Sequence, residues 1–265
     1  MQSNLKLKPI IKWSGGKSRE IQRFCHHYPE DFDVYIEPFV GGGSVFFNLN
    51  FNKNIIADVH KELINFYQQI KEDKCLEIYE RVSKFGTDED TYYFVRDKMD
   101  IKTPVDEAIR FYYLRKNAFR GMLRYNKSGK FNIPWGRYKS VNYDLIKNPD
   151  YVKLLKQTEV NVASFEYIFD TYNDESNFVF LDPPYDSVFK DYGYCQFGEE
   201  HQRRLADRFK STKNKCLMII GESELIKSLY NGYIVDSYFK KYLFKIHSGR
   251  IASDSGNQHL IIKNY

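Results

Sequence analysis

Cysteine is scarce in this 265-residue chain, and its thiols are far apart. The cysteines are Cys25, Cys75, Cys195 and Cys216, and no two form a Cys-x-x-Cys pair. Thiolate zinc sites and disulfide frameworks both need characteristic cysteine spacings, so this spacing supports neither of them. We therefore expect no metal cofactor and a reducing, intracellular environment.

Long apolar runs are also missing. The N-terminal segment MQSNLKLKPIIKW lacks the continuous apolar stretch of a signal peptide. No segment approaches the about 18 apolar residues that a membrane span requires. We expect a soluble protein without membrane contact. The chain also lacks internal repeats and low-complexity tracts.

The composition suits one globular body, or one core with a sizeable inserted subdomain. Hydrophobic residues make up 42% of the chain and aromatic residues 17%, with 22 Tyr and 21 Phe. Aromatic rings serve core packing and also stacking on nucleobases. The net charge of +5 is a weak indication of an anionic partner, and its meaning depends on whether the basic residues cluster.

Two stretches of the chain have the pattern of an α/β sheet. Residues 1–59 contain short apolar strands at 34–39 and 54–59, together with glycine-bearing turns. Residues 151–265 contain an amphipathic helix beginning near Glu199. Further strands are predicted there at 177–185, 215–223, 232–244 and 259–265.

The intervening residues, 60–150, have a helical pattern instead. Apolar residues recur three and four positions apart in the segments 62–70 and 107–119. Residues 121–140 are predicted to form a basic β-hairpin, with turn-forming residues at Asn126, Ser128 and Gly129. One sheet interrupted by a helical insertion explains this order, and the insertion should lie beside the active site.

A glycine-rich turn follows the first predicted strand in IEPFVGGGSVFFN, residues 36–48. Glycines at 41–43 let the backbone approach a ligand, although a bare strand-to-helix turn is also common. The next strand ends at Asp58, where an acidic residue can hydrogen-bond ribose hydroxyls. An aspartate that only ends a strand at the protein surface would give the same sequence pattern.

The motif LDPPY, residues 181–185, ends an apolar strand at the position where open α/β sheets bind ligands. Consecutive prolines make the turn stiff and remove backbone donors. The carboxylate of Asp182 and the carbonyl of Pro183 can both accept hydrogens from a planar amine, while Tyr185 offers a ring for stacking. An exocyclic amino group on a base matches this arrangement better than a simple capping turn does.

A third motif, IKWSGGK at 11–17, completes a recognisable order of segments. Together with EPFVGGGS and DPPY, it resembles the adenine-N6 DNA methyltransferases typified by the bacterial Dam family, class alpha. Further segments fit the same resemblance: 57–67, 124–139, 197–206 and 259–265.

The resemblance implies a Rossmann-like sheet that binds S-adenosylmethionine and releases S-adenosylhomocysteine. Residues 1–59 and 151–265 would form the catalytic domain, and 60–150 the helical target-recognition domain with its hairpin. The implied catalytic residues are Asp182, Pro183, Pro184 and Tyr185. The implied cofactor residues are Trp13, Gly15, Lys17, Glu37, Phe39, Gly41, Gly43, Asp58, Phe165 and Asp182.

The resemblance also implies a double-stranded DNA partner and extrusion of the target adenine from the stack. The implied DNA-contacting residues are Lys12, Arg96, Lys116, Phe119, Arg120, Arg124, Asn126, Asn132, Pro134, Arg137 and Lys139. Base edges would be contacted by Lys12, Arg124 and Pro134, and phosphates by Lys116, Asn126, Asn132 and Arg137.

The expected recognition site is GATC or a related four-base site such as CATG. Enzymes that read GATC tend to have an aromatic residue followed by Asn, whereas this chain has Phe119 followed by Arg120. That difference should change how the protein contacts the partner base that is left unpaired when the target adenine is extruded. A restriction endonuclease acting on the same site is a further possible partner.

Other activities remain open at the level of sequence. The same motif could methylate cytosine N4, RNA adenine or a glutamine amide, or the chain could be an inactive DNA-binding homologue. Intact DPPY and glycine motifs argue against loss of activity. No Pro-Cys motif is present, which disfavours chemistry at cytosine C5.

Overall fold

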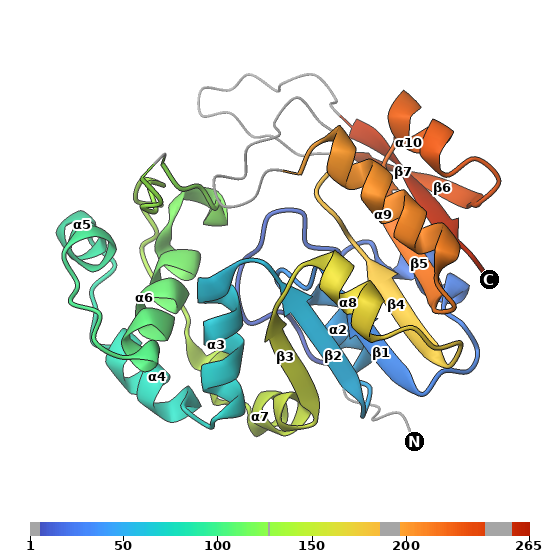
Figure 1. Ribbon diagram of the computed structural model, residues 1–265. Coiled ribbons are helices and arrows are strands. Elements are labelled where there is room, and N and C mark those ends of the chain that lie inside the picture. Colours follow the sequence, from blue (N-terminus) through green and yellow to red (C-terminus); the bar gives the residue numbers. More distant parts are fainter. Residues whose placement is uncertain (1–5, 127, 186–196, 242–255) are drawn as a thin grey trace.

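The computed structural model describes residues 6–126, 128–185, 197–241 and 256–265 (Figure 1). They form a seven-stranded sheet with the order β3-β2-β1-β4-β5-β7-β6. Neighbouring strands are parallel except at β7, which is antiparallel to both β5 and β6. The strands are β1 Val34–Glu37, β2 Asn54–Asp58, β3 Thr158–Val162, β4 Asn177–Leu181, β5 Lys215–Gly221, β6 Ile234–Lys241 and β7 Gly256–Lys263. The predicted Rossmann-like α/β fold is confirmed.

Helices cover both faces of this sheet. The α-helices are α1 Ile21–Phe24, α2 Ser44–Leu49, α3 Lys61–Lys71, α4 Cys75–Val82, α5 Glu89–Asp97, α6 Pro104–Asn117, α7 Pro149–Lys156, α8 Phe165–Thr171, α9 Glu199–Ser211 and α10 Glu224–Leu229. Short 3₁₀ helices are η1 Cys25–His27, η2 Phe119–Gly121 and η3 Asp144–Lys147. None of the helices in the described part of the chain combines the length and the apolar character that a membrane span requires.

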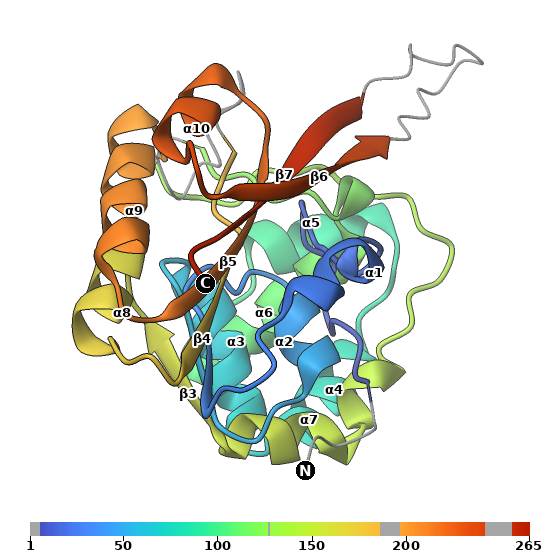
Figure 2. The same ribbon diagram turned by 90° about the vertical axis from the view of Figure 1, so that its right-hand side faces the viewer.

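The core has two layers because successive strand residues point to opposite faces of the sheet. Tyr35 and Phe178 pack on the face covered by α1, α2 and the long inserted helices. Ile36 and Val179 pack on the opposite face, under α8, α9 and α10. Figure 2 shows these two helical layers on either side of the sheet. Burial on both faces explains the continuous apolar sequences of the central strands.

Helices α3 to α7 all lie between β2 and β3 in the chain. Helix α3 packs beside β2 and β3, α6 packs on α3, and α4 and α5 lie against α6, farther from the sheet (Figure 1). The predicted helices at 62–70 and 107–119 correspond to α3 and α6. Helix α6 begins at Pro104, and a capping box between Thr103 and Asp106 closes its first turn. The proposed domain boundary at 150 falls inside α7, and the division into domains stays a prediction.

The predicted hairpin at 121–140 forms a turn with isolated bridges instead of regular strands. Bridges join Tyr125 to Phe131 and Ala118 to Trp135. The Asn126 side chain accepts hydrogen bonds from the backbone of Ser128 and Lys130, which closes the turn as predicted.

One strand of the sheet was not predicted, and one predicted strand extends beyond the described residues. The edge strand β3 was not among the predicted strands, because its sequence TEVNV is partly polar and only partly buried. The predicted strand 232–244 contains β6, and its residues 242–244 lie outside the described residues.

Candidate active site

A cavity of about 1990 Å³ opens at the carboxyl ends of β1, β2 and β4. The turn after β1, Asp58 at the end of β2 and the DPPY turn after β4 all line it. The loop containing Trp13 and Lys17 forms another wall. The topology therefore brings the three sequence motifs to one place, at the edge of the sheet where ligands bind in such folds.

The glycine turn fits closely against Trp13. Gly41 has φ +45°, and a Cβ there would lie 2.5 Å from Trp13 Nε1. A Cβ at Gly42 would lie 2.7 Å from Trp13 Cβ. Asp58 accepts hydrogen bonds from the backbone N–H groups of Gly41 and His60, both at 3.0 Å. Asp58, predicted as a cofactor ligand, thus also fixes the glycine turn.

Lys17 is buried and paired with the carboxylate of the DPPY motif. Its Nζ donates to Asp182 Oδ1 at 2.7 Å, to Asp182 Oδ2 at 2.8 Å and to the carbonyl of Gly15 at 2.8 Å. The same Nζ lies 5.2 Å from the centre of the Tyr185 ring. Only 1% of Lys17 is exposed, so its charge is directed into the site.

Three carboxyl groups in the cavity wall have raised pKa values. Burial raises the pKa of Glu37 to about 8, although hydrogen bonds from Tyr35 and the backbone of Phe46 oppose the shift. Burial also raises the pKa of Asp58 to about 6. The pKa of Asp182 is raised by burial despite the Lys17 ammonium. A cationic ligand placed among these groups would favour their ionised forms.

Glu37 makes the stability of the ligand-free protein depend on pH. Its pKa is about 8 in the folded chain against an ordinary value of 4.5, so unfolding releases a proton between these values and stability falls as pH rises. Between pH 5 and 7, Glu37→Gln should gain stability relative to wild type by about 1.4 kcal/mol per pH unit. Urea unfolding of both proteins at each pH measures this change. An equal difference at both pH values would show that Glu37 is already ionised at pH 5.

An aromatic cluster forms another wall of the cavity. Phe39 lies 5.7 Å from both Phe165 and Phe197, measured between ring centroids, and Phe165 lies 5.9 Å from Phe197. The prediction named Phe39 and Phe165 but not Phe197. The segment 197–206 was noted in the sequence only as part of the family resemblance.

A buried charged group behind Tyr185 was missed from the sequence. Glu20 Oε2 lies 2.8 Å from His259 Nδ1, and the Glu20 carboxylate accepts hydrogen bonds from Tyr238 and Lys240 at 2.8 and 2.5 Å. Burial raises the pKa of Glu20, but the hydrogen bond from His259 and the charges of Lys17 and Lys240 outweigh it and lower the pKa to about 2. The His259 ring stands edge-on to Tyr185 at 5.2 Å. No local motif relates Glu20 to strands so distant in the chain.

Most of the predicted DNA-contacting residues follow α6 in one connected loop region. Lys12 lies against this region, because its Nζ is 3.3 Å from the Lys116 carbonyl and 4.1 Å from the Tyr138 ring centre. Arg124 Nε donates to Asn132 Oδ1 at 2.8 Å across the turn. Burial, and then the neighbouring Lys12, lowers the pKa of Lys116.

Other predicted DNA residues have internal contacts. Arg96 on α5 forms an ion pair with Asp97 at 2.8 Å and donates to the Ile133 carbonyl at 3.1 Å. Arg120 has φ +53° and places its guanidinium 5.2 Å from the Phe119 ring centre. The remaining predicted positions in this region are Pro134, Arg137 and Lys139.

Arg115 joins the loop region to the cavity and was not predicted. It is fully buried and donates to the carbonyls of Lys12, Gly121 and Met122. Its guanidinium also lies 5.2 Å from the Trp13 ring centre. A basic residue inside a charged stretch gives no signal in the sequence that it will be buried.

The family model described as D12 class N6 adenine-specific DNA methyltransferase matches residues 13–248. The chain belongs to this family. It is an adenine-specific DNA methyltransferase, which confirms the resemblance drawn from its motifs. The family description names adenine in DNA and so does not support cytosine N4, RNA or a glutamine amide as the substrate.

Similar proteins have names that agree with this family. The type II methyltransferase M.CviBI of Paramecium bursaria Chlorella virus NC1A is 53% identical over 98% of this chain and 100% of its own length. The type II methyltransferase M.MjaIII of Methanocaldococcus jannaschii is 33% identical over 98% and 100%. A DNA adenine methylase of Haemophilus influenzae is 31% identical over 88% and 86%.

Proposed function

We propose that this methyltransferase uses S-adenosylmethionine and acts on an adenine flipped out of a short duplex site. The observation that supports this most directly is the ion pair between the buried Lys17 and the partly exposed Asp182 of the DPPY turn. It places an oriented carboxylate next to the Tyr185 ring and beside the glycine turn. A planar aromatic amine and a cofactor can therefore meet in one cavity.

The residues of the cavity fit S-adenosylmethionine, which is cationic at its sulfonium. Glu37, Asp58 and Asp182 have raised pKa values. A positively charged ligand beside these groups would lower their pKa values by favouring the ionised carboxylates. Trp13, Phe39 and Phe165 line the same cavity, where aromatic surfaces suit an adenine ring. The remaining proposed cofactor positions are Gly15, Lys17, Gly41 and Gly43. When bound, the cofactor supplies the activated methyl group.

The DPPY turn would hold the target amine. Each oxygen of Asp182 accepts one hydrogen bond from Lys17, and a carboxylate oxygen has a second lone pair for the amine. The Pro184 carbonyl accepts from Gln202 at 2.8 Å, which fixes the turn so that the Pro183 carbonyl can serve as the other acceptor. Tyr185 would stack on the extruded base. These groups position the amine and stabilise charge developing on its nitrogen.

The proposed target-recognition region is 60–150, and the proposed catalytic parts are 1–59 and 151–265. We propose GATC, or a related four-base site such as CATG, as the sequence methylated. Base edges in the major groove would be contacted by Lys12, Arg124 and Pro134, and phosphates by Lys116, Asn126, Asn132 and Arg137. Long-read mapping of methylated adenines in the DNA of a host expressing this chain tests the site directly.

Arg124→Ala should relax the choice of base at one guanine position. A bidentate contact to guanine discriminates by roughly 1 to 3 kcal/mol, or about 5- to 150-fold in relative rate. Methylation rates on duplexes with single substitutions in the site measure the change. Arg137→Ala is the matched control, because loss of a phosphate contact should weaken all sequences alike. An unchanged base preference in Arg124→Ala would assign Arg124 to the backbone.

The relatives named type II methyltransferases support a place in restriction and modification. We propose that a cognate endonuclease cleaves the same unmethylated site. DNA methylated by this chain should then resist cleavage by any endonuclease that recognises the mapped site and is blocked by adenine methylation. Full cleavage of such DNA would show that this chain does not protect the mapped site, and would contradict the proposed pairing.

A further inference from the structure

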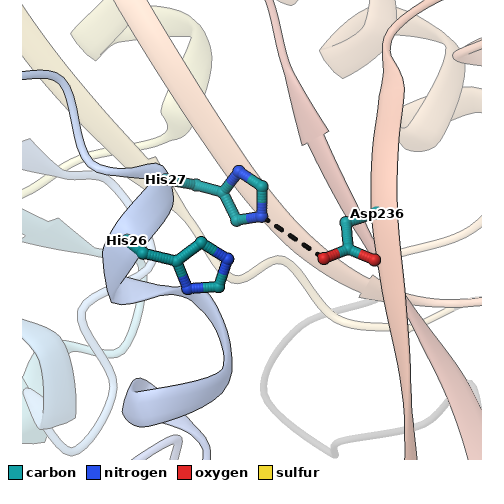
Figure 3. A group of neighbouring side chains, drawn as sticks. All are labelled: His26, His27 and Asp236. Atoms are coloured by element: carbon teal, nitrogen blue, oxygen red, sulfur yellow. Dashed lines mark ion pairs between the residues drawn. The ribbon is translucent and has the colours of Figure 1, made fainter.

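Two histidines and an aspartate meet outside the cavity, where η1 lies beside β6. Figure 3 shows His26 and His27 on η1 and Asp236 on β6, with their side chains directed toward one another. One potential ligand atom from each residue lies within 4.8 Å of the other two. The two imidazole rings are 4.2 Å apart between centroids. Imidazole and carboxylate are a ligand set suited to divalent transition metals.

The separation of His27 and Asp236 fits a shared metal better than a direct hydrogen bond. His27 Nε2 is 3.5 Å from Asp236 Oδ2, whereas a nitrogen-to-oxygen hydrogen bond is typically about 2.9 Å. Two ligand atoms that each lie about 2.1 Å from a tetrahedral zinc ion are about 3.4 Å from each other. Apart from this long contact with Asp236, His27 Nε2 is shielded from solvent and has no hydrogen-bond partner among the described residues. A buried nitrogen in that state is unfavourable unless another group satisfies it.

We propose that His26, His27 and Asp236 form a zinc-binding site. Asp236 is already oriented for this role, because its Oδ1 accepts a hydrogen bond from the Ser237 backbone at 2.7 Å while Oδ2 faces His27. His26 is exposed, so rotation of its side chain can shorten the remaining ligand separations. The exposure of His26 and Asp236 leaves a fourth position for water.

The site would be structural, not catalytic. The η1 helix follows the segment that contains Lys17 and Glu20, and β6 contains Tyr238 and Lys240, which bond to Glu20. Zinc at this site would join η1 to β6. It would therefore link the same two segments a second time, at the C-terminal end of α1. Metal that binds the folded state should therefore stabilise the protein against unfolding.

Calorimetric titration of the full chain, prepared without a polyhistidine tag, tests the proposal with Zn²⁺ alone. We expect one zinc per chain and a rise in the midpoint of thermal unfolding. His27→Ala and Asp236→Asn should each weaken binding by about tenfold or more, since even partners of metal ligands affect affinity that much. Both variants should keep adenine methylation, which separates this test from that of the proposed function.

His201→Ala is the matched control, because it removes a histidine from α9 and should leave the affinity for zinc unchanged. Co²⁺ provides a second measurement, since its visible spectrum reports the type of ligand. The proposal is overturned if Zn²⁺ fails to bind, or if His27→Ala binds it as tightly as wild type does. Thiolate charge-transfer absorption with Co²⁺ would also overturn it, by placing the metal on a cysteine.

Discussion

Asp182→Ala is expected to lower the rate of methyl transfer on the order of 10²-fold or more. The Asp182 carboxylate is the proposed side-chain acceptor for the amine, and Lys17 donates to both of its oxygens. Without it, the amine loses an oriented partner as charge develops on nitrogen. Single-turnover methylation of a short duplex measures the loss, and duplex binding should persist because the proposed DNA contacts lie elsewhere.

A stability effect must be separated from this loss of rate. Asp182→Ala leaves the buried Lys17 ammonium without its carboxylate, which typically costs about 3 to 5 kcal/mol. Asp182→Asn keeps the shape of the side chain and one acceptor oxygen, and a thermal melt of each variant shows which remain folded. Near wild-type methylation by either folded variant would remove the carboxylate from the mechanism.

Gly41→Ala is expected to reduce methyl transfer by a similar factor through the geometry of the cavity. The added Cβ would lie 2.5 Å from Trp13 Nε1, whereas ordinary contacts begin at 3.4 Å. Asp58 holds the Gly41 N–H and Tyr67 holds its carbonyl, so the indole has to move. A misplacement of about 1 Å at a reacting site can cost about 10²-fold in rate. Initial rates and titration with S-adenosylhomocysteine would follow the loss of activity and of cofactor affinity.

Gly198→Ala supplies the matched control for this substitution. A Cβ added at Gly198 would meet no other described atom within 4 Å, and the φ of −99° there is accessible to alanine. This variant should keep wild-type rates and cofactor affinity. If Gly41→Ala behaved like Gly198→Ala, Trp13 would have room to move and the close fit would have no functional role.

Trp13 shows what the motifs alone could predict and what required the structure. Its place in KWSGGK predicted a cofactor role by resemblance. The structure shows why the neighbouring motif needs glycines, since Gly41 faces the indole of Trp13 and Gly42 faces its Cβ. Lys17 illustrates the opposite case, because its motif gave no sign that its partner would be Asp182, 165 positions away in the chain.

The sequence by itself determined the features that depend on neighbouring residues. Apolar spacing of three and four predicted α3 and α6, and continuous apolar runs predicted the central strands. The order of the glycine and DPPY motifs predicted the family. These features need only local backbone preferences and the chemistry of contiguous side chains.

Tertiary structure decided which distant groups meet. The Glu20–His259 pair, the burial of Arg115 and the facing of His27 and Asp236 all join segments that only the sheet order brings together. The edge strand β3 depended on its pairing with β2, because its own sequence is partly polar. Such contacts are set by long-range packing and by the burial of charge, and neither leaves a periodic pattern in the chain.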